Sequence, residues 1–273
     1  MTRTLIIALG LVGGLLTNAP TQTFDRFHHP AISTKLNYDS LFTAAVDLSQ
    51  STRGQEVVQL CIEHYGGREK LDQLRSLRLT YAMLRMMSKD STTVVKSFAD
   101  DRRYKVSRRQ VDVDEQRLLI HDSAWFAGRD TIFAFQKTRY CAELFSYLTL
   151  SLPKALYAEP FSTIRYGTRA QDSLEYIYCR KNDSLTMVVG INPDDFSIVS
   201  SEGIIPGDSI ATVFVNKFSD FGLYDGFLFP RHLVNIAMGL EVGRSRLKSV
   251  AVNPLFDEKE FTMERRLKSQ TPR

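Results

Sequence analysis

The stretch Val57–Met83, VVQLCIEHYGGREKLDQLRSLRLTYAM, determines how the folded part of this chain begins. Apolar residues recur at helical spacing as far as Tyr65. Gly66 is placed to end that helix in a left-handed conformation. A short second helix over Arg68–Leu74 follows, and the period then changes to two over Leu77–Met83. This alternation predicts a half-buried strand that leads into a sheet.

The remainder of the chain reads mostly as strand and turn. Short strands separated by turn residues, without βαβ alternation, predict an α+β fold with an antiparallel sheet of about 10–11 strands. A sheet of that size must curl, close or split. The expected strands after the first are Thr92–Ala99, Arg103–Arg109, Gln116–His121, Ala124–Ala127, Thr131–Phe135, Thr163–Arg169, Leu174–Arg180, Leu185–Gly190, Phe196–Glu202, Ile210–Phe218, Phe229–Met238 and Val242–Val252.

One apolar helix is expected to interrupt the strands, over Cys141–Ala158. Leu144, Phe145 and Leu148 keep helical spacing, and Pro153 is expected to end or kink the helix. This helix would cover the concave face of a curled sheet.

The N-terminus reads as an export signal. Residues 1–19 combine Arg3, the apolar run Leu5–Leu16 and a small-residue exit at Thr17-Asn18-Ala19. The run is shorter than the ~20 residues of a membrane span, although an N-terminal anchor is the alternative. We expect a flexible leader over 20–50 with a short helix at Tyr38–Leu48, one domain over 51–265, and a tail over 266–273. The location implied is the periplasm or cell envelope.

Composition and cysteine usage exclude some partners and cofactors. The 273 residues are 43% hydrophobic and 24% charged, and the net charge of +4 lacks the clustered basic footprint of a nucleic-acid binder. Cys61, Cys141 and Cys179 are too far apart in sequence for zinc-ligand spacing. Buried, inert thiols are favoured, and the sequence leaves open whether any two pair.

No catalytic signature is present. The sequence lacks GxSxG, HExxH, Walker and GxGxxG motifs. His121-Asp122-Ser123 reads as a turn, because neighbours on a strand point apart. A basic strand around Arg103, Lys105 and Arg109 could meet anionic lipid headgroups or an acidic partner, but a solvated strand face is favoured. We therefore expect no enzyme, cofactor or metal site.

The content of aromatic residues and methionine says more about function than the motifs do. The chain has 17 Phe, 11 Tyr and 7 Met residues. Such side chains line lipophilic cavities as readily as they fill cores, and the sequence leaves both interpretations open.

Several local patterns occur in a familiar order. They are Ile62–Leu79, Asp122-Ser123-Ala124-Trp125, Asp225–Pro230, and Asn253-Pro254 followed by Phe256 and Phe261. Together they resemble the LolA/LolB-like superfamily, the periplasmic lipoprotein-carrier fold, although Ser123 stands where a Gly is usual. The resemblance implies an open half β-barrel whose helices cover an apolar cavity. It also implies binding of lipids or lipoprotein acyl chains without catalysis.

The expected ligand site combines strand and helix residues. Candidate wall residues are Leu79, Tyr81, Met83, Trp125, Phe133 and Phe214, and candidate lid residues are Leu144, Phe145 and Leu148. The membrane surface and envelope proteins are further candidate partners. Two alternatives stay open: a structural or interaction protein of the envelope with a filled core, and a secreted hydrolase.

Overall fold

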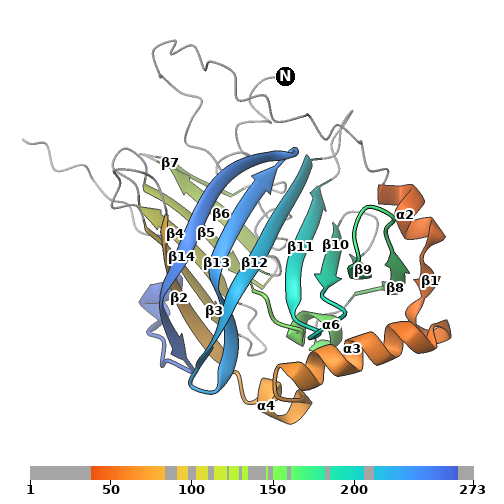
Figure 1. Ribbon diagram of the computed structural model, residues 1–273. Helices are drawn as coiled ribbons and strands as arrows, with labels where there is room; N and C mark the ends of the chain where they lie inside the picture. Colours follow the sequence, from red (N-terminus) through yellow and green to blue (C-terminus); the bar gives the residue numbers. More distant parts are fainter. Residues whose placement is uncertain are drawn as a thin grey trace, which may run out of the picture. The chain divides into compact units, whose positions relative to one another are not determined.

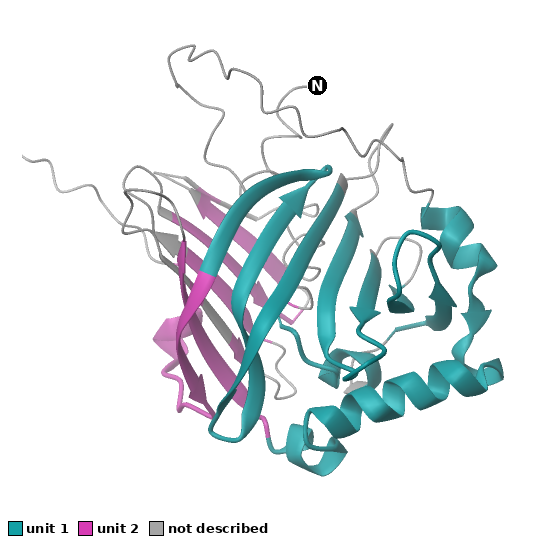
Figure 2. Cartoon of the chain, in the orientation of Figure 1, with its two compact units in different colours: residues 1–73, 147–245 teal, residues 74–146, 246–273 magenta. Residues whose placement is uncertain are grey.

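The computed structural model divides the chain into two compact units. It describes residues 38–83, 91–97, 103–109, 114–121, 123–128, 131–134, 146, 150–158, 161–181, 185–205 and 212–263. Unit 1 comprises residues 1–73 and 147–245, and unit 2 comprises 74–146 and 246–273 (Figure 2). The boundary falls inside one long strand, β14 (Leu240–Val252). The signal, leader and single-domain boundaries stay predictions, and residues 1–37 and 264–273 lie outside the described part.

The predicted α+β fold with antiparallel strands is confirmed (Figure 1). Fourteen strands occur among the described residues, compared with the thirteen strand ranges given above and the estimate of about 10–11 strands for the sheet. The helices are α2 (Tyr38–Ala44), α3 (Thr52–His64), α4 (Arg68–Asp72) and α6 (Lys154–Ala158), with 3₁₀ turns η1 (Leu48–Gln50) and η3 (Glu258–Phe261). No helix in this part of the chain is both long and apolar enough to cross a membrane.

The Gly66-Gly67 junction behaves as its sequence predicts. Both glycines have positive φ, 99° and 85°. The Gly66 N–H donates to Glu63 O and the Gly67 N–H donates to Ile62 O, each at 2.9 Å. This pair of bonds is a Schellman motif, which satisfies carbonyls at the end of α3. The chain then continues through α4 into β2 (Ser76–Met83).

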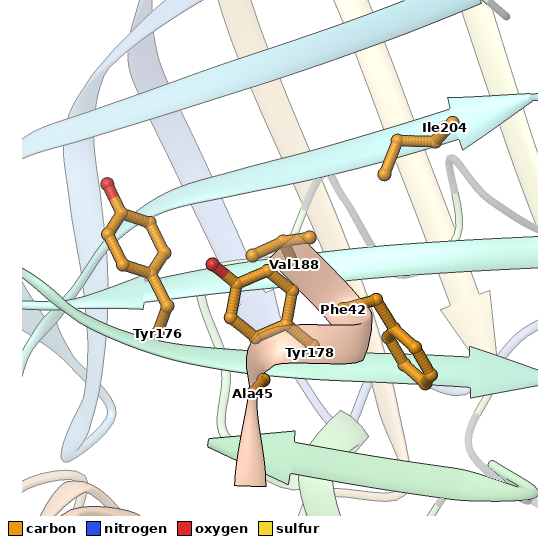
Figure 3. Packing of buried hydrophobic residues seen from close by; sticks show 6 residues of the cluster. All are labelled: Phe42, Ala45, Tyr176, Tyr178, Val188 and Ile204. Carbon is orange, nitrogen blue, oxygen red and sulfur yellow. The ribbon is translucent and has the colours of Figure 1, made fainter. Parts of the chain in front are cut away.

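Unit 1 contains an antiparallel run of strands in the order β1-β8-β9-β10-β11-β12-β13, followed by the first part of β14. Helix α2 covers one face of the first half of this run. Phe42 and Ala45 pack against Tyr176, Tyr178, Val188 and Ile204 (Figure 3). The strands are β1 (Val46–Asp47), β8 (Thr163–Thr168), β9 (Glu175–Lys181), β10 (Leu185–Ile191), β11 (Ile198–Ile205), β12 (Thr212–Tyr224) and β13 (Phe227–Ala237).

Charged residues join α2 to the strands beneath it. Arg165 donates to Phe42 O at 3.0 Å, and Arg180 pairs with Asp39 at 2.9 Å. The Arg180 guanidinium also stacks on the Phe42 ring, with Cζ 3.9 Å from the ring centroid. A seven-residue helix is marginal in isolation, so these contacts and the burial of Phe42 keep α2 in place.

Unit 2 contains the antiparallel order β2-β3-β4-β5-β6-β7. Asn253, at φ +51°, fixes the entry to β2, because its side-chain oxygen accepts hydrogen bonds from the N–H groups of Arg75 and Ser76. The remaining strands are β3 (Ser91–Ser97), β4 (Tyr104–Arg109), β5 (Asp114–Ile120), β6 (Ser123–Gly128) and β7 (Thr131–Ala134).

Two helix predictions differ from the structure. The helix expected over Tyr38–Leu48 ends at Ala44, because Val46 and Asp47 pair with β8 instead. The mid-chain helix over Cys141–Ala158 lies largely outside the described residues. Its described end shows that Pro153 precedes α6, since the Leu156 N–H donates to Pro153 O at 2.8 Å.

Candidate functional site

One face of unit 2 gathers most of the predicted wall residues. Burial alternates along β2, and Leu79, Tyr81 and Met83 are all buried. Pairing across the strands aligns Leu79 with Val94, Val106, Arg117, Phe126 and Phe133 in one row. Directly paired residues lie on the same face of a sheet. The backbone register therefore places Phe133 in the row of Leu79, and its side chain lies outside the described part.

The same face carries two buried cations that sequence reasoning did not single out. Arg117 is only 2% exposed, and its guanidinium lies 5.1 Å from the centroid of the Phe126 ring. Lys96 pairs with Leu77 and Tyr104, and its ammonium lies 6.0 Å from the Tyr104 ring. The sequence held a signal for both, because each falls on the apolar phase of its strand. We call Leu77, Leu79, Tyr81, Met83, Lys96 and Arg117 the cationic apolar face.

Trp125 lies on the opposite face of unit 2. It pairs with Leu118, and both pack with Phe261 in a cluster that also includes Ile120, Phe256 and Met263. The rings of Phe256 and Phe261 meet edge to face at 5.3 Å. Trp125 therefore departs from the expected set, because the C-terminal segment contacts the strand face to which it belongs.

The basic strand β4 contacts the same C-terminal segment. Lys105 is buried and donates to Thr262 O at 2.8 Å, and the Arg103 guanidinium lies 5.0 Å from the Phe261 ring. Arg78 on β2 pairs with Glu260. The favoured interpretation of a solvated strand face is wrong for Lys105, because the chain itself supplies its partner.

Phe214 belongs to unit 1. Cross-strand pairing places Phe214 in one row with Ala237 on one side and Gly203, Met187 and Cys179 on the other. The side chains of Phe214, Ala237, Met187 and Cys179 are all buried. The neighbouring row contains Asn216 and Asn235, joined by a hydrogen bond of 2.6 Å. Phe214 thus lines an apolar face of its own unit.

The candidate lid residues Leu144, Phe145 and Leu148 lie outside the described residues. The segment that follows them, 150–158, is attached to α3 and α4. Tyr65 OH and Ser151 Oγ are 3.0 Å apart, and Ser151 donates to Ile198 O. Lys154 donates to Leu71 O at 3.0 Å, and Tyr157 donates to Asp72. This segment therefore has a fixed position beside the Gly66-Gly67 junction within unit 1.

A buried ion pair lies beneath α2 in unit 1. Arg169 donates two hydrogen bonds to the Glu202 carboxylate, at 2.7 and 2.9 Å. Its guanidinium also stacks on Tyr176, with Cζ 3.9 Å from the ring centroid. Burial lowers the pKa of Arg169, but the hydrogen bonds and charge of Glu202 outweigh it and raise the pKa overall. Arg169 therefore remains charged, and its guanidinium donates both of these hydrogen bonds to the Glu202 carboxylate.

The thiols and the exposed histidine give no support to catalysis. Cys61 and Cys179 are buried, as the favoured interpretation expects, and both are free, which the sequence left open. Burial raises the pKa of both thiols and makes them unreactive. Ser219 pairs with His232, whose Nδ1 lies 3.6 Å from Asp220, but this grouping is solvated and Asp220 also binds Arg231. Within the described residues, no three His, Cys, Asp or Glu side chains are grouped to hold a metal.

Comparison with known proteins gives structural similarities alone. No family model and no curated protein matches the chain. A solved outer membrane lipoprotein-sorting protein domain from Vibrio parahaemolyticus is 10% identical, covers 76% of this chain and 94% of its own, and has a TM-score of 0.45. A DUF1329 family protein from Desulfovibrio piger is 8% identical, covers 76% and 96%, and has a TM-score of 0.46. The chain is likewise similar to a LolA superfamily protein from Nitrosomonas europaea, at 13% identity, 76% and 97% coverage and a TM-score of 0.43.

Proposed function

We propose that this chain is an exported, non-enzymatic binder of lipophilic ligands in the cell envelope, and that it takes acyl chains of lipids or lipoproteins. The observation that carries the proposal is the cationic apolar face of unit 2. Leu79, Tyr81 and Met83 offer a dry surface to a chain of methylenes. Arg117 lies in the row of Leu79, Lys96 lies in the adjacent row of Leu77, and both offer positive charge to an anionic group.

The chemistry of this face selects one class of ligand. An apolar wall alone would bind any hydrocarbon, and a cationic one alone would prefer soluble anions. A wall with both suits an amphiphile whose carboxylate or phosphate sits near its acyl chain, because a charge-assisted hydrogen bond is strongest in dry surroundings. The wall proposed here comprises Leu79, Tyr81 and Met83, with Phe133 at its far end by register and Phe214 lining a separate face of unit 1.

Binding at this face requires movement. Leu79 and Tyr81 are almost fully buried, so a ligand reaches them only when the side chains that cover them move aside. The same burial also favours a second candidate function, a structural or interaction protein of the envelope with a filled core. In that case the face would never open.

Titration of the chain with palmitate and with hexadecanol distinguishes a lipid binder from a protein with a filled core. We expect palmitate to bind the purified full chain saturably and hexadecanol to bind more weakly. Arg117→Gln should weaken palmitate binding by about tenfold, the worth of one charged hydrogen bond, and leave hexadecanol binding unchanged. Arg117→Lys should restore part of the palmitate affinity. Circular dichroism should show that both variants fold.

Two results would oppose this proposal. Absence of saturable binding of either ligand to the wild-type chain would favour the filled core. An equal loss of palmitate and hexadecanol binding in Arg117→Gln would mean that Arg117 supports the fold and does not meet the anionic group.

A further inference from the structure

The hairpin that joins β13 to β14 ends in exposed apolar side chains. Its two-residue turn is Met238-Gly239, and Met238 is 48% exposed and Leu240 71% exposed. Exposed apolar patches with a polar rim often mark sites that bind proteins or membranes. The Met238 N–H donates to Val213 O at 3.0 Å, which fixes the turn against β12.

The turn has a backbone that does not suit methionine. Met238 has φ +51° and Gly239 has φ +79°, the conformation in which hairpin turns strongly prefer Asn-Gly. A left-handed backbone is unfavourable for a side chain such as methionine. Asparagine would fold more easily at position 238 and would be more soluble, so folding does not explain the apolar residue there.

Half-buried apolar residues extend from the turn along the strands. Val215 pairs with Ile236, two positions before Met238, and the next pair on that face is Lys217 with Val234. We call Val215, Ile236, Met238 and Leu240 the apolar tip. It lies within one end of β12, β13 and β14.

Basic side chains follow the apolar tip at a regular distance. Lys217 is opposite Val234, four residues from Met238, and Arg244 is four residues beyond Leu240. At about 3.4 Å per residue, both lie roughly 14 Å along the strands from the turn. Within unit 1, the segment 231–245 contains Arg231, Arg244 and Glu241, which gives a net charge of +1.

We propose that the apolar tip inserts into the surface of a bilayer that contains anionic phospholipid. Apolar faces that lie in the membrane interface enter by about 5–10 Å. A tip of this depth would place Met238 and Leu240 among the acyl chains and hold Lys217 and Arg244 near the headgroups, where anionic lipid attracts them. This docking goes beyond ligand binding and does not depend on it.

The test needs a local readout, because an apolar run such as Leu5–Leu16 would bind bilayers by itself if it is retained. The purified full chain is mixed with vesicles of phosphatidylglycerol or of phosphatidylcholine, and hydrogen exchange is measured along 233–244. We expect phosphatidylglycerol vesicles to slow exchange there by at least tenfold. Phosphatidylcholine vesicles should slow it much less, and added salt should weaken the effect.

Matched variants assign the effect to the tip. Met238→Asn with Leu240→Thr should abolish the local protection and lower vesicle partitioning at least tenfold. The chain should stay folded, because Asn-Gly suits the turn. Leu223→Thr changes a leucine that is 72% exposed on β12 and should have no effect. Lys217→Gln with Arg244→Gln should weaken phosphatidylglycerol binding severalfold and leave phosphatidylcholine binding unchanged.

Unchanged exchange along 233–244 with phosphatidylglycerol vesicles would overturn the proposal. Equal partitioning of the tip variant and the wild-type chain would do the same. Either result can occur while palmitate still binds, so this proposal and the proposed function fail separately.

Discussion

Replacing Glu202 with alanine is expected to destabilise the chain by about 3–5 kcal/mol, the cost of breaking a buried ion pair on one side. The change would leave the Arg169 guanidinium buried between Tyr176 and Tyr178 without its two charged acceptors. Urea unfolding followed by circular dichroism measures the loss. The dependence of the unfolding free energy on urea concentration should be the same for wild type and variant, and the urea midpoint of the variant should be lower.

An exposed ion pair serves as the control. Glu241 pairs with Arg244 at the surface, at 2.6 Å, so Glu241→Ala should leave the midpoint unchanged. If Glu202→Ala and Glu241→Ala behave alike, the Arg169–Glu202 pair contributes no more than a surface pair, and our description of the packing beneath α2 is wrong.

Replacing Phe261 with alanine is expected to cost about 3 kcal/mol and to expose Trp125. Truncation of a buried Phe usually costs 3–5 kcal/mol, and the cluster around Phe261 is small. Trp125 is the only tryptophan of the chain and packs in that cluster. Its emission should shift to longer wavelength in the variant, and its urea transition should move to a lower midpoint.

Leu255 offers the matched control on the same segment. It is 98% exposed, so Leu255→Ala should change neither the emission nor the midpoint. Unaltered Trp125 emission in Phe261→Ala would show that the C-terminal segment does not pack on the face of β5 and β6.

Local sequence chemistry predicted most of the elements in this fold. Gly66-Gly67 sets a helix end because glycine, which lacks a Cβ, adopts positive φ values without steric cost. The period of two over Leu77–Met83 gave β2 with nearly the observed bounds. Such signals depend on a few neighbouring residues, so a single sequence contains them.

Contacts between distant segments could not be predicted in the same way. Alternation placed Trp125 and Leu79 on strands, but only the pairing of β2 through β6 shows that they lie on opposite faces. Arg169 and Glu202 are 33 residues apart, and neither has a local feature that indicates a pair. Met238 was expected to continue a strand, because methionine is not a turn-forming residue and Gly239 was the sole turn signal.

The cationic apolar face could have been found in part from the sequence. Lys96 is in phase with Val94, and Arg117 is in phase with Leu119, so each interrupts an apolar series with a charge. A buried charge is costly unless it meets a partner, and this cost makes the pattern informative. Which groups surround each charge depends on the three-dimensional arrangement.

Native mass spectrometry of the full chain purified from cell envelopes tests the central claim most directly. Our account predicts a saturable adduct whose mass is that of an acyl amphiphile. Organic extraction should remove the adduct, and palmitate should restore it. Arg117→Gln should carry less of the adduct. Detection of the mass of the chain alone, both before and after addition of palmitate, would contradict the account. The chain would then be an envelope protein with a filled core.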